Sequence, residues 1–150
     1  MNATQDTAKL LNDLHQTLLD SRNGFKTAAQ AVKDPVLTDE LMAYSFQRDQ
    51  FARQIGSLIE AIGEKTSEGG SMSGALQRGW MNLEIAISSN DRHAILSECE
   101  RGEDVALEEF RRAVEAGSPV EFDPVITDQL ATVRATHDRI KSLRDAAKQN

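Results

Sequence analysis

Cysteine is almost absent from this sequence, which contains Cys99 and no other. A lone cysteine cannot form a disulfide within the chain, and it excludes a zinc site built from several cysteines. Cys99 also lies on an apolar helical stripe, between Leu96 and Ala106. We therefore expect a buried thiol that packs as a small hydrophobic side chain, and we regard a reactive thiol as the less favoured alternative.

Long apolar runs and a surplus of positive charge are also missing. No stretch approaches the roughly 20 apolar residues that a membrane-spanning helix needs. The first residues, MNATQDTAKLL, lack a basic start followed by an apolar run, so we expect no secretory signal and a cytoplasmic location. The net charge of −7 argues against a nucleic-acid or anionic-membrane partner, because both require a concentrated positive surface.

Proline and aromatic residues are scarce, with three prolines and 5% aromatics, and clusters of β-branched residues are lacking. Helix-forming residues dominate instead, which predicts an all-α protein. A chain of 150 residues suits one domain, residues 1–150, that buries about 70% of the surface exposed by the unfolded chain.

Apolar residues at steps of three and four predict four long helices and one shorter helix: residues 4–32, 35–62, 74–88, 91–116 and 123–148. Asp34-Pro35 and Asp123-Pro124 predict helix starts, because aspartate caps the first turn and proline fits its first position. Gly63 and Gly117 predict helix ends. Residues 64–73, with a central Gly-Gly pair, are the expected loop.

The connection between the second and third long helices is long and contains the shorter helix with Trp80. Fifteen helical residues cover about 22 Å, and the flanking loop residues extend that reach along the bundle. A lengthwise crossover at this point distinguishes ferritin-like topology from simple up-down-up-down bundles. We therefore predict a ferritin-like four-helix bundle with a short extra helix in the crossover, and we expect Trp80 to pack on the bundle.

Three of the apolar stripes are each interrupted once near mid-helix, by Arg48, Glu103 and His137. Because an isolated buried charge is costly, these residues are expected to meet as one buried polar layer in which Glu103 pairs with Arg48. Gly102 precedes Glu103 and has two explanations. We favour close approach of a neighbouring element over a local helix distortion that aims Glu103 inward.

Several segments resemble those of a known family, from about Lys9 to Asp145. They are Leu11-Asn12-Asp13-Leu14, Gly24-Phe25, Arg48 with Phe51, Arg78-Gly79-Trp80, the stretch ECERGED at 98–104, and His137-Asp138-Arg139-Ile140. The chain is similar to the bacterial ferritin-like four-helix-bundle proteins of the Pseudomonas type, a family of unknown function. The resemblance implies a ferritin-like bundle and a stress-related role, without an established activity.

Ferritin-like di-iron proteins carry Glu on two helices and Glu-x-x-His on the other two. Each of the three histidines has the wrong residue three places earlier: Asn12 before His15, Asn90 before His93 and Arg134 before His137. The di-iron motif is therefore absent from the sequence, and we predict no cofactor. His15 and His93 are expected to face solvent or to lie near helix ends.

A non-catalytic ferritin-like protein with a structural or interaction role, working as a homodimer, is the function that these patterns favour. Met42, Phe46 and Ile59 are spare apolar residues that are expected to pack on the short helix or on a second subunit. The first alternative is a metal-binding or redox protein that holds iron or another divalent metal with four residues: Glu103, His137, Glu100 and Asp20. The second is a small-molecule binder in which Arg48 holds an anion.

Overall fold

The computed structural model describes residues 3–66, 79–117, 119 and 122–148. They contain five helices and no strand: α1 (Ala3–Ala31), α2 (Pro35–Ala61), α4 (Leu83–Ser88), α5 (Arg92–Ala116) and α6 (Asp123–Lys148). The prediction of an all-α protein is therefore confirmed for the part of the chain that the structure describes. None of its helices is both long enough and apolar enough to cross a lipid bilayer.

The ends of the long helices follow the residues that predicted them. Asp34 caps α2 by accepting a hydrogen bond from the backbone N–H of Val36 at 2.9 Å. Asp91 caps α5 in the same way, accepting from His93 N–H at 3.0 Å. Gly63 has φ +78°, a left-handed conformation that favours glycine and ends the helix before it. Local capping chemistry therefore fixed these boundaries.

The short helix differs from its prediction. Gly79 and Trp80 are helical, a turn follows at Met81 and Asn82, and α4 begins at Leu83; the expected residues 74–78 lie outside the described part of the chain. The Asn82 backbone N–H donates to Glu98 Oε2 of α5 at 3.2 Å. The Asn82 amide thus donates to a side-chain carboxylate and not to a carbonyl of its own helix. The predicted helix 74–88 is interrupted at this point. The expected loop 64–73 is described as far as residue 66.

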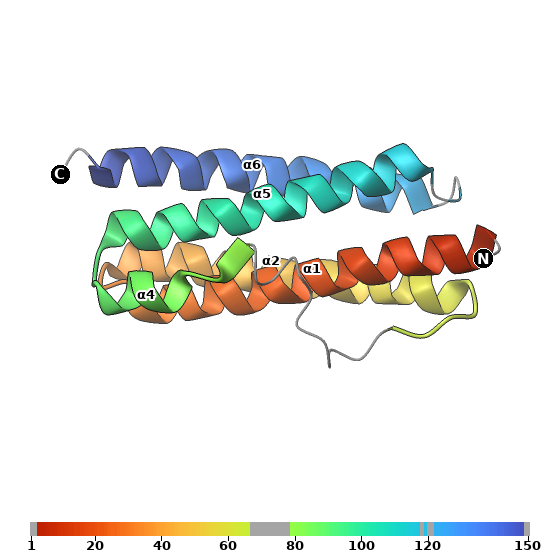
Figure 1. Ribbon diagram of the computed structural model, residues 1–150, viewed down its shortest axis with the longest axis horizontal. Coiled ribbons are helices and arrows are strands. Elements are labelled where there is room, and N and C mark those ends of the chain that lie inside the picture. Colours follow the sequence, from red (N-terminus) through yellow and green to blue (C-terminus); the bar gives the residue numbers. More distant parts are fainter. Residues whose placement is uncertain (1–2, 67–78, 118, 120–121, 149–150) are drawn as a thin grey trace.

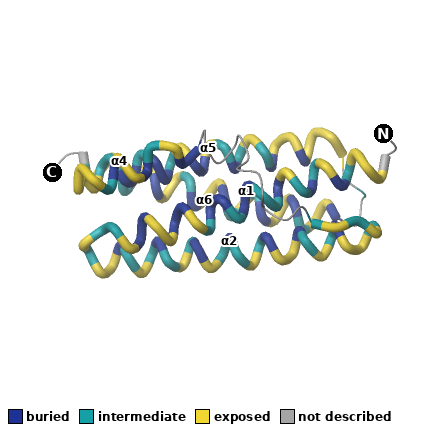
Figure 2. Tube along the Cα trace, turned by 60° about the horizontal axis from the view of Figure 1, so that its bottom comes forward, coloured by how far each residue is buried: buried dark blue, intermediate teal, exposed yellow. Residues whose placement is uncertain are grey.

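The four long helices lie side by side as a bundle, as Figures 1 and 2 show. α1 packs against α2, α5 packs against α6, and α1 also contacts α5. α2 and α5 run in the same direction, so the chain returns along the bundle between them (Figure 1). α4 packs against α1 and α5 on this return path.

The core consists of two apolar clusters with polar side chains between them. The clusters draw on opposite halves of the long helices: Leu14, Ile55, Phe110 and Ile126 in one, and Phe25, Leu41, Leu96 and Ile140 in the other. At the level between the clusters, six polar residues are buried: Asp20, Ser21, Ser45, Arg48, Glu103 and Thr136. Buried polar side chains therefore separate the two apolar clusters. Arg48 and Glu103 are among them, and His137 is not.

Trp80 fills a slot between α1 and α5. A Cβ atom added to Gly24 would lie 2.4 Å from Trp80 Cδ2, and one added to Gly102 would lie 2.2 Å from Trp80 Cε2. The indole also meets the Phe25 ring edge-on, with 5.4 Å between centroids and 73° between planes. Trp80 is 7% exposed, so its predicted packing on the bundle is confirmed. Gly102 does accommodate a close neighbour, and that neighbour is this indole.

Candidate functional site

Arg48 and Glu103 form an ion pair in the middle of the bundle. Both side chains have no exposed surface, and Arg48 is the largest fully buried side chain of the described residues. Arg48 Nη2 donates to Glu103 Oε2 at 2.7 Å, and Nη1 donates to the other carboxylate oxygen. Arg48 Nε donates to Gln47 Oε1 at 3.2 Å, and the guanidinium carbon lies 5.3 Å from the centre of the Phe25 ring. This two-bond pairing compensates both buried charges.

The ion pair also affects the two alternative sites predicted from the sequence, the metal site that includes Glu103 and the anion-binding site at Arg48. Both carboxylate oxygens of Glu103 accept hydrogen bonds from Arg48, so a metal ion on this carboxylate would lie beside a positive guanidinium, which disfavours Glu103 as a ligand. Arg48 does not reach the surface, which gives no support to the alternative in which it holds an anionic ligand. Asp20, the other interior carboxylate considered, is buried and accepts a hydrogen bond from Gln16 Nε2 at 3.0 Å.

His137 does not join this buried pair, and its placement in the polar layer is wrong. Its side chain is 16% exposed and lies between α6 and α5. The buried position at that level of α6 is Thr136, whose Oγ1 donates to the Thr132 carbonyl at 3.1 Å. The residues of α6 that are buried run through Ile126, Gln129, Val133, Thr136 and Ile140. Gln129 and Thr136 are polar, so this buried face carries fewer apolar residues than the neighbouring face that contains His137. A count of apolar residues therefore favoured the face with His137.

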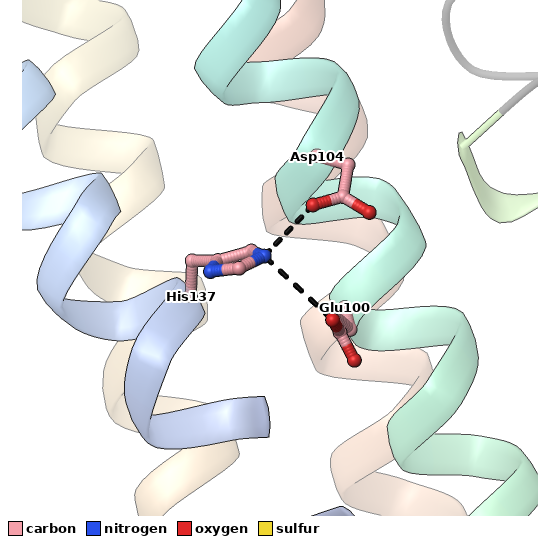
Figure 3. A group of neighbouring side chains, drawn as sticks. All are labelled: Glu100, Asp104 and His137. Carbon is pink, nitrogen blue, oxygen red and sulfur yellow. Dashed lines mark hydrogen bonds and ion pairs between the residues drawn. The ribbon is translucent and has the colours of Figure 1, made fainter. Parts of the chain in front are cut away.

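His137 instead faces two carboxylates of α5, as Figure 3 shows. Its Nε2 lies 2.7 Å from Asp104 Oδ1 and 3.8 Å from Glu100 Oε1, while Nδ1 lies 3.1 Å from Asp138 Oδ1. Of the four residues proposed as metal ligands from the sequence, Glu100 and His137 come together, and Glu103 and Asp20 do not join them. Asp104 takes their place. Its signal in the sequence was its position four residues after Glu100, on the same helix face.

The charges around His137 are strongly negative. Partial burial lowers the pKa of His137, but the hydrogen bond with Asp138 and the charges of Asp104 and Glu100 outweigh it and raise the pKa overall. Arg144 of α6 balances part of this charge by donating to Glu100 Oε2 through Nη1. The imidazole between the two helices therefore keeps its proton to higher pH than an ordinary histidine side chain does.

Cys99 is fully buried, as expected. Burial raises the pKa of the thiol, and the nearby Glu103 and Glu98 carboxylates raise it further. The thiol therefore stays protonated at neutral pH. Because the thiolate is the reactive form, this environment is that of an inert core side chain.

His15 was expected to face solvent or to lie near a helix end, and instead it lies well inside α1, half-buried in a hollow between α1 and α2. The hollow is also lined by four charged residues: Arg22, Asp49, Arg53 and Glu60. Burial lowers the pKa of His15, and the positive charge of Arg22 lowers it further. His93 lies in the first turn of α5, near a helix end as predicted.

Replacement of His15 by Gln is expected to make the protein less sensitive to mild acid. Because the pKa of His15 lies below its ordinary value of 6.5 in the folded chain, the unfolded chain takes up this proton first. The wild type therefore loses stability relative to His15→Gln as the pH falls below 6.5, and not above it. Urea unfolding at about pH 8 and about pH 5 checks this. An equal difference in stability at both pH values would contradict it.

Comparison with known proteins places most of this chain in a family. Residues 6–116, from α1 through α5, match the family described as Domain of unknown function (DUF2383). The matched range contains Arg48, Glu103, Glu100 and Asp104, whereas His137 lies beyond it. A search of curated proteins gave no match. Since the match covers well over half of the 150 residues, the chain belongs to the DUF2383 family, a domain of unknown function.

Proposed function

We propose that this protein is a non-catalytic, ferritin-like bundle protein of the bacterial cytoplasm with a structural or interaction role. The ferritin-like assignment is supported by the parallel run of α2 and α5, which requires a lengthwise crossover between the second and third long helices. The stress-related part of the role rests on the resemblance of the segments quoted above.

The buried pair of Arg48 and Glu103 is the observation that carries the non-catalytic assignment. Ferritin-like enzymes bind their metal ions with carboxylates and histidines that project into the middle of the bundle. Here a guanidinium occupies that level and holds both oxygens of the carboxylate. A second cation beside Arg48 would be repelled at close range in a medium of low dielectric constant. Interior iron chemistry is therefore disfavoured.

Ferrous iron oxidation tests this assignment directly. In air, the protein is expected to oxidise added ferrous iron no faster than buffer does, because Glu103 and Asp20, the carboxylates described at the middle of the bundle, are already held by hydrogen bonds. The Arg48→Met/Glu103→Leu double variant, which removes the pair without leaving a lone charge, is the matched control and should give the same rate. A rate well above buffer that disappears in this variant would overturn the assignment.

We also propose that the protein forms a homodimer, with Phe46 and Met42 of α2 at the contact between the two subunits. Phe46 of α2 is 67% exposed, and Met42, one turn earlier, is half-buried. Ile59, the third residue considered, is fully buried in the core and is not available for a partner. A large apolar side chain exposed beside a second one supports contact with another copy of the chain.

Phe46→Ser is therefore expected to weaken self-association at least tenfold, since aromatic residues often dominate an interface. Sedimentation equilibrium of both proteins over a wide concentration range measures the dissociation constants. Phe46 is exposed, so the variant should fold, and far-UV circular dichroism confirms that it does. A wild-type protein that is monomeric at every concentration would remove the dimer from the proposal.

A further inference from the structure

We propose that Glu100, Asp104 and His137 form a binding site for a divalent transition-metal ion where α5 packs against α6. This site lies outside the bundle interior and goes beyond the function proposed above. It uses neither Glu103 nor Asp20. An ion bound here would link the last helix of the bundle to α5, whose residues fall within the matched family region.

The geometry of the three side chains suits one ion. Glu100 and Asp104 are four residues apart on α5 and therefore lie on the same helix face, while His137 approaches from α6 (Figure 3). One ligand atom from each residue lies within 4.8 Å of the other two. Metal–ligand bonds of about 2.0–2.2 Å to nitrogen and oxygen place neighbouring ligand atoms roughly 3 Å apart. The separations of 2.7 and 3.8 Å from His137 Nε2 lie on either side of that spacing.

Two neighbouring side chains orient the ligands. Asp138 Oδ1 lies 3.1 Å from His137 Nδ1, so it can accept a hydrogen bond from Nδ1–H in the tautomer whose Nε2 lone pair is directed at the ion. A carboxylate behind a ligating imidazole is the usual second partner of histidine in metal sites. Arg144 binds Oε2 of Glu100, and the other oxygen, Oε1, faces His137. Both contacts therefore fix ligand atoms toward a common point.

The mixed donor set indicates which ions would bind. One imidazole nitrogen and two carboxylate oxygens suit Zn²⁺, Fe²⁺ or Mn²⁺, whereas Mg²⁺ and Ca²⁺ prefer oxygen ligands throughout. Glu100 and His137 are mostly buried, and Asp104 is 61% exposed, so water can complete the coordination. The positive charge of Arg144 reduces the affinity. We therefore infer an exchangeable ion, bound when its concentration rises.

Isothermal titration of the chelator-treated full chain with Zn²⁺, and separately with Mn²⁺, tests the proposal. One site is expected. His137→Gln and Asp104→Asn should each weaken binding by tenfold or more, because each removes one of three ligands. His93→Gln is the matched control: it removes a half-buried histidine from the same bundle, and it should change the affinity less than twofold.

A stability measurement provides an independent readout. An ion that binds the folded chain alone raises the midpoint of thermal unfolding, and the rise grows with ion concentration. Zn²⁺ should therefore raise the midpoint of the wild type and of His93→Gln, and at the same ion concentration it should raise that of His137→Gln less. No detectable binding at millimolar ion, or binding that His137→Gln leaves unchanged, would overturn the proposal. Neither outcome affects the assignment of the interior ion pair. That assignment is tested by comparing iron oxidation by the wild type and by Arg48→Met/Glu103→Leu, and both proteins keep Glu100, Asp104 and His137.

Discussion

Glu103→Ala is expected to lower the free energy of unfolding by about 3–5 kcal/mol. The variant removes the partner of Arg48 and leaves a guanidinium that has no exposed surface. A buried charge without a partner loses the hydration that it has in the unfolded chain, and the cation–ring contact with Phe25 replaces little of it. Chemical unfolding followed by circular dichroism measures the change. A loss below about 1 kcal/mol would place the pair in contact with water.

Two further variants show whether the loss of stability comes from the unpaired Arg48 or from the removal of a carboxylate as such. Glu108→Ala removes a carboxylate of the same helix that is 47% exposed and pairs with Arg111 and Arg112, and it should cost no more than about 1 kcal/mol. The double variant Arg48→Met/Glu103→Leu should be more stable than Glu103→Ala, because replacing a whole buried pair by apolar side chains is often neutral or stabilising. A double variant less stable than Glu103→Ala would contradict this reasoning.

Trp80→Ala is expected to cost about 3–5 kcal/mol, the range observed when a buried aromatic side chain is truncated. The indole occupies the slot formed by Gly24 and Gly102 and also packs on Phe25, so its removal leaves a cavity at the junction of α1, α5 and the crossover. Because Trp80 is the sole tryptophan, unfolding must be followed by circular dichroism instead of fluorescence.

Gly102→Ala tests whether an added methyl group in the same slot raises or lowers the stability of the protein. Alanine favours a helix over glycine by about 1 kcal/mol, but here its Cβ would lie 2.2 Å from the indole. The variant should therefore destabilise the wild type by about 1–3 kcal/mol, and it should become neutral or stabilising once Trp80 is alanine. Gly56→Ala in α2 is the control. Its nearest neighbour would be Thr66 at an ordinary 3.6 Å, so it should stabilise by about 1 kcal/mol. If Gly102→Ala also stabilised the wild type, Trp80 would not occupy this slot.

The elements of the fold were predictable because their signals are local. Asp34 and Asp91 accept hydrogen bonds from amides two residues ahead, and Gly63 adopts a backbone conformation that other residues disfavour. These effects depend on a few neighbouring residues, and they appear directly in the sequence. The division of the short helix at Asn82 was not predictable, because its amide binds Glu98, sixteen residues away.

The candidate site was partly predictable, for a similar reason. Arg48 and Glu103 each interrupt an apolar stripe, and the cost of burying one charge alone implies the other. The inward stripe of α6 was ambiguous, because Thr136 and His137 are adjacent and neither is apolar. Packing against α5 placed Thr136 inside and directed His137 toward Glu100 and Asp104.

By itself, the sequence determined the helical class, the limits of the long helices and the presence of a buried charged pair. Each of these follows from periodicity, capping or the cost of desolvating a charge. Tertiary structure alone decided that Trp80 lies between two glycines of different helices, and that His137 of α6 meets two carboxylates of α5. Those contacts depend on the rotation of each helix about its axis. That rotation is set by the packing of many side chains together, and no short stretch of sequence specifies it.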